Sequence, residues 1–194
     1  MEGMTEERLE EIRVKYGAMG WKEELWPLVR LLSAMELHGI VEIGTFKGGM
    51  LKIWEELLEE DGALITIDKR NEVKTWDLKK TTKNLTFIQG LSQDEETVEK
   101  VREILGERKI DFLFIDGSHK YEDVKRDFEL YLPFVRKGGI VALHDIRAQD
   151  TEIYRKTTTV SILWAELKKV FRTMEILPPW ECKGSDGIGV VFVD

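Results

Sequence analysis

Short apolar runs alternate with longer helical patterns over most of the chain, and this alternation restricts the possible folds more than any other feature of the sequence. Five such runs fall at residues 39–44, 63–68, 85–90, 110–117 and 138–145. Each run is apolar almost throughout rather than at every second position, which is typical of strands buried on both faces. Strands separated by helices in this way form a parallel sheet covered on both sides.

The segments between these runs carry apolar residues at helical spacing. The three clearest sets are Met50, Ile53, Trp54, Leu57 and Leu58; then Val98, Val101, Ile104 and Leu105; then Val124, Phe128, Tyr131 and Leu132. A weaker helical pattern covers residues 72–83. Before the first strand, a helical face is formed by Trp21, Leu25, Leu28, Val29 and Leu32, after a shorter amphipathic stretch at Leu9, Ile12 and Tyr16.

The last part of the chain follows a different pattern. A polar stretch at residues 146–159 precedes a predicted helix at Val160–Phe171, and the runs "RTMEIL" and "GIGVVFVD" then follow with no helix between them. Two strands without a crossover helix pair as an antiparallel hairpin. We therefore predict a Rossmann-like α/β fold with a seven-stranded, mostly parallel sheet, helices on both faces and a C-terminal antiparallel hairpin.

The length of 194 residues favours a single domain over residues 1–194. Its parts are an N-terminal helical segment (1–36), the βα units (37–145), in which we expect any bound ligand to lie, and a loop, helix and closing hairpin (146–194). We expect the 146–159 loop to be mobile without ligand. We expect three segments to select a small-molecule substrate: this loop, the N-terminal helices with Trp21 and Trp26, and the 178–187 loop.

The net charge and the composition restrict the classes of partner that the chain can bind. The chain has 29 basic and 37 acidic residues, a net charge of −8, which argues against nucleic acid or an anionic membrane as the main partner. Cys182 is the only cysteine, so no internal disulfide forms. The first 30 residues do not read as a signal peptide, and no apolar run reaches membrane-spanning length. We expect a cytoplasmic protein whose N-terminal segment allows a homodimer.

Function in an open α/β sheet lies at the carboxyl ends of the parallel strands. Reading those ends in order gives Glu42-Ile43-Gly44, then Asp68, Gln89-Gly90, Asp116-Gly117-Ser118-His119 and His144-Asp145. Four of the five ends carry a carboxylate, and two of the three histidines of the chain fall here. Because these ends meet at one edge of the sheet, we predict a polar site there.

The first of these ends, "VEIGTFKGG", does not match either of two common phosphate-binding loops. A P-loop needs Lys and then Ser or Thr after its last glycine, but Gly49 is followed by Met50 and Leu51. A G-x-G-x-x-G dinucleotide loop needs a glycine at Phe46. The acid at Glu42 repels phosphate and attracts an ammonium group. The loop therefore favours a ligand with a nucleoside and an amino acid end but no phosphate.

The carboxylate of Asp68 ends the second strand. An acid at this place accepts hydrogen bonds from both ribose hydroxyls, each worth about 1.5–3 kcal/mol for a charged acceptor. An acid at this position would bind the ribose of NAD equally well. The choice between the two cofactors therefore depends on Glu42 and Phe46.

These motifs resemble the class I S-adenosylmethionine-dependent methyltransferases. "VEIGTFKGG" is similar to the first loop of catechol-type, metal-dependent O-methyltransferases. "FLFIDGSHKYEDVKRDFELYLPFVRKGGIVALHDI" resembles the branch that includes sugar and macrolide O-methyltransferases and cephalosporin-hydroxylase-like proteins. The resemblance covers residues 41–145, and it implies S-adenosylmethionine as cofactor and O-methylation of a small hydroxylated molecule.

The resemblance also implies roles for individual residues. Around the methionine part it places Glu42, Gly44, Thr45, Phe46 and Gly48; at the ribose Asp68 and Lys69; at the adenine Gly90, Leu91 and Ser92; and beside the cofactor Asp116 and Gly117. Many relatives carry an acidic residue at the position of Leu91 that binds the adenine amino group. Here Ser92 or Gln93 is the candidate replacement.

A metal site and a general base are implied in the same way. Relatives hold a divalent cation at the ends of the fourth and fifth strands, and the matching residues are Asp116, His144 and Asp145. Two carboxylates suit Mg²⁺, whereas a histidine favours Mn²⁺ or a similar ion. His119 stands where catechol-type relatives carry a catalytic lysine, and a histidine can accept a hydroxyl proton near neutral pH.

Several alternatives stay open. Gly44 and Gly48 would also permit tight packing of strand against helix, Asp68 could cap a helix, and His119 could be a structural hydrogen-bonding residue. At the level of function, the alternatives are an NAD-dependent oxidoreductase and a catalytically inactive cofactor-binding module.

Overall fold

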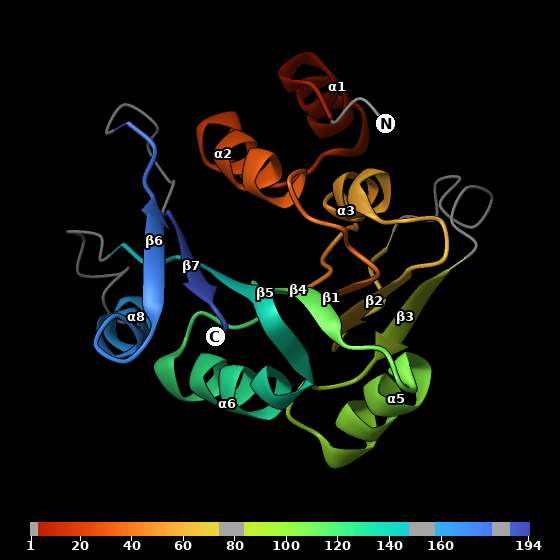
Figure 1. The fold of residues 1–194 in the computed structure, drawn as a ribbon, viewed down its shortest axis with the longest axis vertical. Coiled ribbons are helices and arrows are strands. Elements are labelled where there is room, and N and C mark those ends of the chain that lie inside the picture. Colours follow the sequence, from red (N-terminus) through yellow and green to blue (C-terminus); the bar gives the residue numbers. More distant parts are fainter. Residues whose placement is uncertain (1–3, 74–83, 148–157, 180–186) are drawn as a thin grey trace.

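The computed structural model describes residues 4–73, 84–147, 158–179 and 187–194. Seven strands form one sheet in the order β3-β2-β1-β4-β5-β7-β6. They are β1 (Gly39–Ile43), β2 (Ala63–Asp68), β3 (Leu85–Gln89), β4 (Ile110–Ile115), β5 (Val135–His144), β6 (Arg172–Ile176) and β7 (Ile188–Phe192). The first five are parallel to one another, and β7 runs antiparallel to both β5 and β6 (Figure 1). This confirms the predicted fold class and the C-terminal hairpin.

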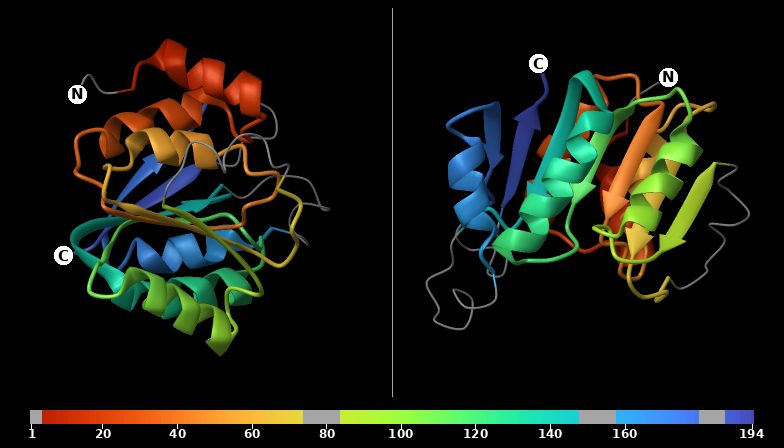
Figure 2. Two further views of the ribbon diagram at one scale, coloured as in Figure 1. Left: turned by 90° about the vertical axis from the view of Figure 1, so that its right-hand side faces the viewer. Right: turned by 90° about the horizontal axis from the view of Figure 1, so that it is seen from below.

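Helices cover both faces of this sheet, as the left view of Figure 2 shows. One layer contains α1 (Glu6–Tyr16), α2 (Lys22–Leu32) and α3 (Leu51–Leu57), and the other contains α5 (Glu95–Leu105), α6 (Tyr121–Tyr131) and α8 (Val160–Leu167). A short 3₁₀ helix, η1 (Leu132–Phe134), links α6 to β5. Among the described residues, no helix is both long and apolar enough to span a bilayer.

Neighbouring residues of each central strand pack into opposite hydrophobic cores, because successive side chains of a strand point to opposite faces. Ile40 of β1 contributes to the core under α1, α2 and α3, whereas Val41 contributes to the core over α5, α6 and α8. All five residues of β1 are buried. This two-sided burial explains why the strands have continuous apolar runs in the sequence.

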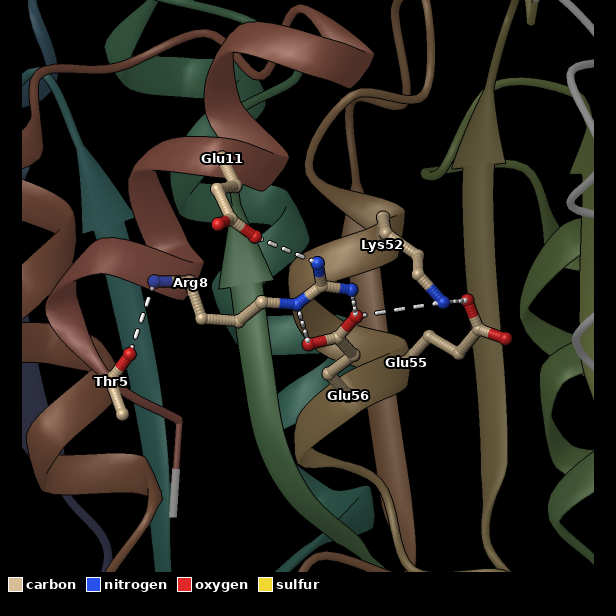
Figure 3. Close-up of polar contacts among 6 residues, drawn as sticks. All are labelled: Thr5, Arg8, Glu11, Lys52, Glu55 and Glu56. Atoms are coloured by element: carbon tan, nitrogen blue, oxygen red, sulfur yellow. Dashed lines mark hydrogen bonds and ion pairs between the residues drawn. The ribbon is translucent and has the colours of Figure 1, made fainter. Parts of the chain in front are cut away.

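The N-terminal helices are part of the same core as the sheet. Leu9 and Ile12 of α1 are fully buried with residues of α2, α3 and the sheet. The helix begins at a Thr5 cap, whose Oγ1 accepts a hydrogen bond from Arg8 N at 3.1 Å. The Arg8 guanidinium also binds Glu56 of α3, with Nε–Oε2 and Nη2–Oε1 distances of 3.0 and 2.5 Å (Figure 3). Apolar burial and an ion pair therefore both attach α1 to α3.

The largest differences between the predicted boundaries and the structure are at α8 and β5. The last helix, α8, ends at Leu167 rather than at Phe171, and the chain then turns through Lys168–Val170 into β6. Strand β5 begins at Val135, three residues before the predicted start. Most of the weak helical pattern at 72–83, most of the 146–159 loop, and Cys182 lie outside the described residues.

The sheet topology places a crevice at one edge. The strand order reverses between β1 and β4, because the chain passes from β1 outward to β2 and β3 and then returns to β4 on the other side. Ile43 of β1 lies level with Ile67 of β2 and Ile115 of β4, so these three strands end at the same height. Ligands of open α/β sheets bind outside such a switch point.

Candidate active site

A cavity of about 740 Å³ opens at the carboxyl ends of β1, β2, β4 and β5. Its wall includes most of the strand-end residues predicted from the sequence: Gly44, Thr45, Phe46, Asp68, Lys69, Asp116, Gly117, His119, His144 and Asp145. The segment between α1 and α2 closes one side with Met19, Gly20 and Trp21. Trp26, the second tryptophan expected near the acceptor, instead packs against the core under α1, α2 and α3.

The loop after β1 is shaped by two glycines. Gly44 has a φ of +100°, and a Cβ atom at this position would lie 2.2 Å from the carbonyl oxygen of Asp116. Only glycine permits this approach of β1 to the end of β4. Gly48 also has a positive φ, of +80°, and its N–H donates to the Thr45 carbonyl at 2.8 Å. Gly48 therefore forms the turn but does not line the cavity.

A second, smaller cavity of about 220 Å³ adjoins the first. Its wall includes Gly90, Leu91, Ser92 and Gln93, which follow β3. Four residues line both cavities: Gly44, Asp68, Lys69 and Gly117. A ligand that occupies both spaces must pass these residues.

Asp68 stands at the junction of the two cavities. Its Oδ2 accepts a hydrogen bond from the backbone N–H of Phe46 at 2.8 Å, and its Oδ1 accepts one from Arg70 at 2.9 Å. Each carboxylate oxygen retains a further lone pair. The side chain is therefore fixed in position and can still accept hydrogen bonds from a ligand.

The residues that follow β3 are organised by a buried acid on α6. The Gln93 amide donates from Nε2 to Asp127 Oδ1 at 2.7 Å, and Tyr131 donates its hydroxyl to the carbonyl of Ser92 at 2.8 Å. With its amide nitrogen committed to Asp127, Gln93 retains its carbonyl oxygen as an acceptor. Leu91 is 49% exposed and offers only apolar contact.

The structure corrects the prediction that Glu42 places a negative charge at the cavity entrance. Its side chain is 1% exposed, and it accepts hydrogen bonds from Trp54 Nε1 and Thr66 Oγ1, both at 2.8 Å. Burial raises the pKa of Glu42 to about 8, so the group is mostly neutral at pH 7. The physical reason is the alternation along β1, because Glu42 points with Ile40 toward the α3 layer rather than toward the ligand.

Glu42 instead supports the first loop from below. Thr66, which donates to Glu42, lies 2.5 Å (Oγ1–Oγ1) from Thr45. The chain of hydrogen bonds thus runs from Trp54 on α3 through Glu42 and Thr66 to Thr45 in the loop. It fixes a wall of the cavity without contributing a charge to it.

Carboxylates and imidazoles gather at the ends of β4 and β5. One ligand atom from each of Asp116, His144 and Asp145 lies within 4.8 Å of those of the other two. His144 Nδ1 is 3.0 Å from Asp145 Oδ1 and 3.5 Å from Asp116 Oδ1. These are the three residues predicted as metal ligands, and the structure brings them together.

His119 is coupled to this cluster through Asp145. The His119 Nδ1 atom contacts Asp145 Oδ2, and about half of the side chain is exposed to the cavity. Asp145 itself is 5% exposed and has a φ of +64°, a conformation that few residues other than glycine adopt. Such local strain is common where a side chain is held in place at a functional site.

The charges of the cluster shift one another's pKa values. Burial raises the pKa of Asp116 to about 6. Burial alone would lower the pKa of His144, but the charge of Asp116 and the hydrogen bonds to Asp145 and Glu24 raise it well above 6.5. Burial also opposes ionisation of Asp145, yet hydrogen bonds from the two histidines hold its pKa below the ordinary range. The hydrogen bond to Asp145 raises the pKa of His119.

One residue of this site escaped the sequence-based prediction. Glu24 of α2 is fully buried and lines the cavity, and its Oε2 lies 3.2 Å from His144 Nε2. The available signal was its position beside Leu25 and one turn before Leu28, both on the apolar face of the helix. A carboxylate on a buried helix face requires a partner.

The donor set fits a divalent cation. Nδ1 of His144 faces two carboxylates while Nε2 faces Glu24, which is the arrangement that metal-ligating histidines show with a supporting carboxylate. Two carboxylates and one imidazole nitrogen suit Mn²⁺ or a similar ion better than Mg²⁺, which prefers oxygen ligands.

The chain matches a known family over its central part. Residues 41–146 match the family described as a methyltransferase domain, which is more than half of the chain. The chain therefore belongs to this family, and the resemblance to class I S-adenosylmethionine-dependent methyltransferases is confirmed.

Two curated relatives share part of the sequence. An uncharacterised protein of Acanthamoeba polyphaga mimivirus is 36% identical over 118 residues, covering 54% of this chain and 50% of that protein. An uncharacterised protein of Sinorhizobium fredii is 29% identical over 107 residues, covering 55% of this chain and 9% of that protein. The chain thus spans half the length or less of these relatives.

Solved O-methyltransferases share the fold at low sequence identity. The Bacillus cereus O-methyltransferase in complex with SAH aligns with a TM-score of 0.67 at 17% identity, over 95% of this chain and 90% of that one. TomG of Streptomyces achromogenes, in complex with SAM, gives 0.66 at 17%, over 100% and 91%. MycE, solved with Mg, SAH and mycinamycin VI, gives 0.65 at 17%, over 95% and 54%.

Proposed function

We propose that the protein transfers the methyl group of S-adenosylmethionine to a hydroxyl oxygen of a small acceptor molecule. The observation that carries this proposal is the pair of adjoining cavities at the switch point, which share Asp68 and lie beside His119 and the acidic cluster. Family membership supports methyl transfer, and the solved neighbours that bind SAM or SAH support the choice of cofactor.

Each part of the cofactor has a matching region. The adenine enters the smaller cavity, where the Gln93 carbonyl accepts from its amino group and Leu91 covers its ring. The ribose hydroxyls donate to Asp68 at the junction. The amino acid end and the sulfonium lie in the larger cavity, beside Gly44 and Asp116. Because Glu42 is buried and mostly neutral, Asp116 and Asp145 supply the negative field that attracts the positively charged cofactor.

The chain's own residues provide the proton transfer. His119 Nδ1 is bound to Asp145, which leaves Nε2 to accept the proton of the acceptor hydroxyl. The acceptor oxygen then forms a bond to the methyl carbon as the sulfur–methyl bond breaks, and S-adenosylhomocysteine leaves with the sulfur electron pair. In-line positioning of oxygen, carbon and sulfur supplies much of the acceleration.

A divalent cation held by Asp116, His144 and Asp145 would lower the pKa of the acceptor hydroxyl and so assist its deprotonation. His119 would then receive the proton from a stronger acid, while Asp145 holds its Nδ1.

The acceptor combines a hydroxyl group with an apolar part. Met19, Trp21 and Phe46 line the larger cavity and are 65%, 41% and 46% exposed, respectively. Apolar side chains exposed at a cavity mouth favour apolar ligand surface. The absence of nucleic acid and membrane partners, a homodimer and a cytoplasmic location stay predictions.

A methyl-transfer assay tests the function. Purified protein is incubated with methyl-labelled S-adenosylmethionine and a panel of hydroxylated aromatic, sugar and polyketide compounds. We expect label in at least one acceptor, and we expect His119→Asn to lower its rate about 10²–10⁴-fold. His38→Asn is the matched control, because His38 also contacts an aspartate, Asp61 at 2.8 Å, but lies at the surface away from the cavity.

Two results would contradict the proposal. Label that reaches no acceptor while the protein binds S-adenosylhomocysteine would identify a cofactor-binding module without turnover. A rate that falls equally in the two histidine variants would remove His119 from the chemistry.

A further inference from the structure

A buried carboxylate links three distant segments of the chain behind the active site. Glu24 of α2 is fully buried, its Oε2 lies 3.2 Å from His144 Nε2 at the end of β5, and its Oε1 accepts from the Gly187 N–H at 3.3 Å before β7. The two bonds use both oxygens. They therefore fix the plane of the carboxylate as well as its position.

This carboxylate is costly for the fold alone. Transfer of a carboxylate into a protein interior is strongly unfavourable unless it is paired, and a paired charge is often no more stabilising than a hydrophobic residue. The neighbours of Glu24 on the buried face are Leu25 and Leu28. A leucine would continue that face, so packing does not explain the acid.

The effect of Glu24 on His144 is directional. An ionised carboxylate can accept hydrogen bonds but cannot donate them. The hydrogen between Glu24 and His144 is therefore carried by Nε2 of His144. A metal-bound imidazole is neutral, because the metal displaces the second proton, and its lone pair is then on Nδ1, which faces Asp145 at 3.0 Å and Asp116 at 3.5 Å. Tautomer and ring orientation are therefore both set from α2.

We infer that Glu24 is a positioning residue that presents His144 Nδ1 as a nitrogen ligand and thereby makes the site selective for Mn²⁺ over Mg²⁺. The inference deepens the proposed function, on which it rests for the role of the cation. The test of this inference measures metal binding, whereas the test of the proposed function measures methyl transfer.

The experiment measures Mn²⁺ binding to the full chain by the electron paramagnetic resonance signal of free Mn²⁺, with Mg²⁺ as competitor. For the parent we expect Mn²⁺ to bind at least tenfold more tightly than Mg²⁺. Glu24→Leu and Glu24→Gln should weaken Mn²⁺ binding about 10–100-fold, the usual effect of removing a carboxylate that supports a ligand histidine. Glu23→Gln is the control, since it removes an exposed acid from the next position of the same helix.

Two further measurements separate positioning from folding. Glu24→Leu leaves the Gly187 N–H and His144 Nε2 without an acceptor and should lower the melting temperature, whereas Glu24→Gln keeps one oxygen acceptor and should lower it less. Metal binding is measured well below the melting temperature of each variant, so a loss of Mn²⁺ affinity in the folded protein is not a loss of structure. His144→Asp should reduce the preference for Mn²⁺ over Mg²⁺, because the nitrogen ligand is replaced by oxygen.

Equal affinities for the two ions in the parent, or unchanged Mn²⁺ binding in both folded Glu24 variants, would overturn the inference. Titration with S-adenosylhomocysteine is run on the same samples. If the nucleoside binds and Mn²⁺ does not, the positioning role fails while the proposed function stands. If Mn²⁺ binds as expected and the nucleoside does not, the proposed function fails instead.

Discussion

At the scale of single residues, the crevice depends on positions where only one side chain fits. Gly44 is the clearest case, because its φ is +100° and its Cα faces the backbone at Asp116 and Gly117. Asp145 is the opposite case, a non-glycine residue held at positive φ by its contacts with two histidines. Gly44 thus permits the close approach of β1 to the end of β4, and Asp145 directs its carboxylate to both histidines.

Gly44→Ala should therefore destabilise the protein by roughly 3 kcal/mol or more, since it adds a backbone clash to an unfavourable φ. Gly17→Ala is the matched control. Gly17 has a φ of +66°, but no atom lies within 4 Å of the position its Cβ would take, so strain alone should cost about 1–2 kcal/mol. Urea denaturation of the two variants measures the difference, and equal losses would contradict the tight approach of β1 to β4.

Glu42 predicts a pH dependence of stability. Its pKa is about 8 in the fold and about 4.3 in an unfolded chain, so the native state binds more protons between these values. The contribution of Glu42 to the free energy of unfolding is fully present below about pH 4.3, and it is lost as the pH rises toward 8. Glu42→Gln, a neutral shape match, should gain roughly 3–4 kcal/mol relative to the parent between pH 5 and pH 8, since a difference of one bound proton changes the stability by about 1.4 kcal/mol per pH unit.

Denaturation of the parent and Glu42→Gln at both pH values gives this difference, and Glu107→Gln at an exposed position controls for the lost carboxylate. A pH-independent gap between the parent and Glu42→Gln would show that Glu42 is ionised in the fold.

At the scale of secondary-structure elements, the N-terminal helices connect fold and site. α1 packs on α3, which carries Trp54 of the network below the first loop, and α2 carries Glu24. Figure 1 shows both helices on the same side of the sheet as α3. Movement of α1 or α2 would therefore shift Trp54 or Glu24 and change the geometry of the site.

Packing rather than the ion pair should hold α1 in place. Leu9→Ala is expected to cost about 2–5 kcal/mol, because Leu9 is fully buried. Arg8→Ala, its neighbour, should cost about 1 kcal/mol or less, because Arg8 is 45% exposed in its contact with Glu56. Chemical denaturation measures both, and a larger loss for Arg8→Ala would reverse this ranking.

Most of the secondary-structure elements and part of the site could be predicted from the sequence. Continuous apolar runs identified the strands, and the missing crossover helix identified the hairpin, because both features follow from chain connectivity. The convergence of Asp116, His144 and Asp145 was also predictable, since parallel strands share their carboxyl edge. The burial of Glu42 was not, because β1 is apolar on both faces and shows no alternation from which the direction of one side chain can be read.

Glu24 was missed for a related reason. Its partners, His144 and Gly187, are 120 and 163 residues away in the sequence. Helical periodicity places Glu24 on the buried face, but it does not specify which distant group lies opposite. Only the tertiary structure shows that the carboxylate meets an imidazole.

At the scale of the whole molecule, the switch point brings together the two cavities and the acidic cluster in one crevice. We propose that this crevice binds a phosphate-free nucleoside with an amino acid end. Asp68 at the junction should carry much of the nucleoside affinity, because a hydrogen bond to a charged acceptor contributes about 1.5–3 kcal/mol.

Calorimetric titration with S-adenosylhomocysteine measures this binding, and NADH is titrated under the same conditions. We predict saturable binding of S-adenosylhomocysteine at one site per chain, at least tenfold weaker in Asp68→Asn, and no binding of NADH. Binding of NADH in place of S-adenosylhomocysteine, with the same sensitivity to Asp68→Asn, would contradict this proposal.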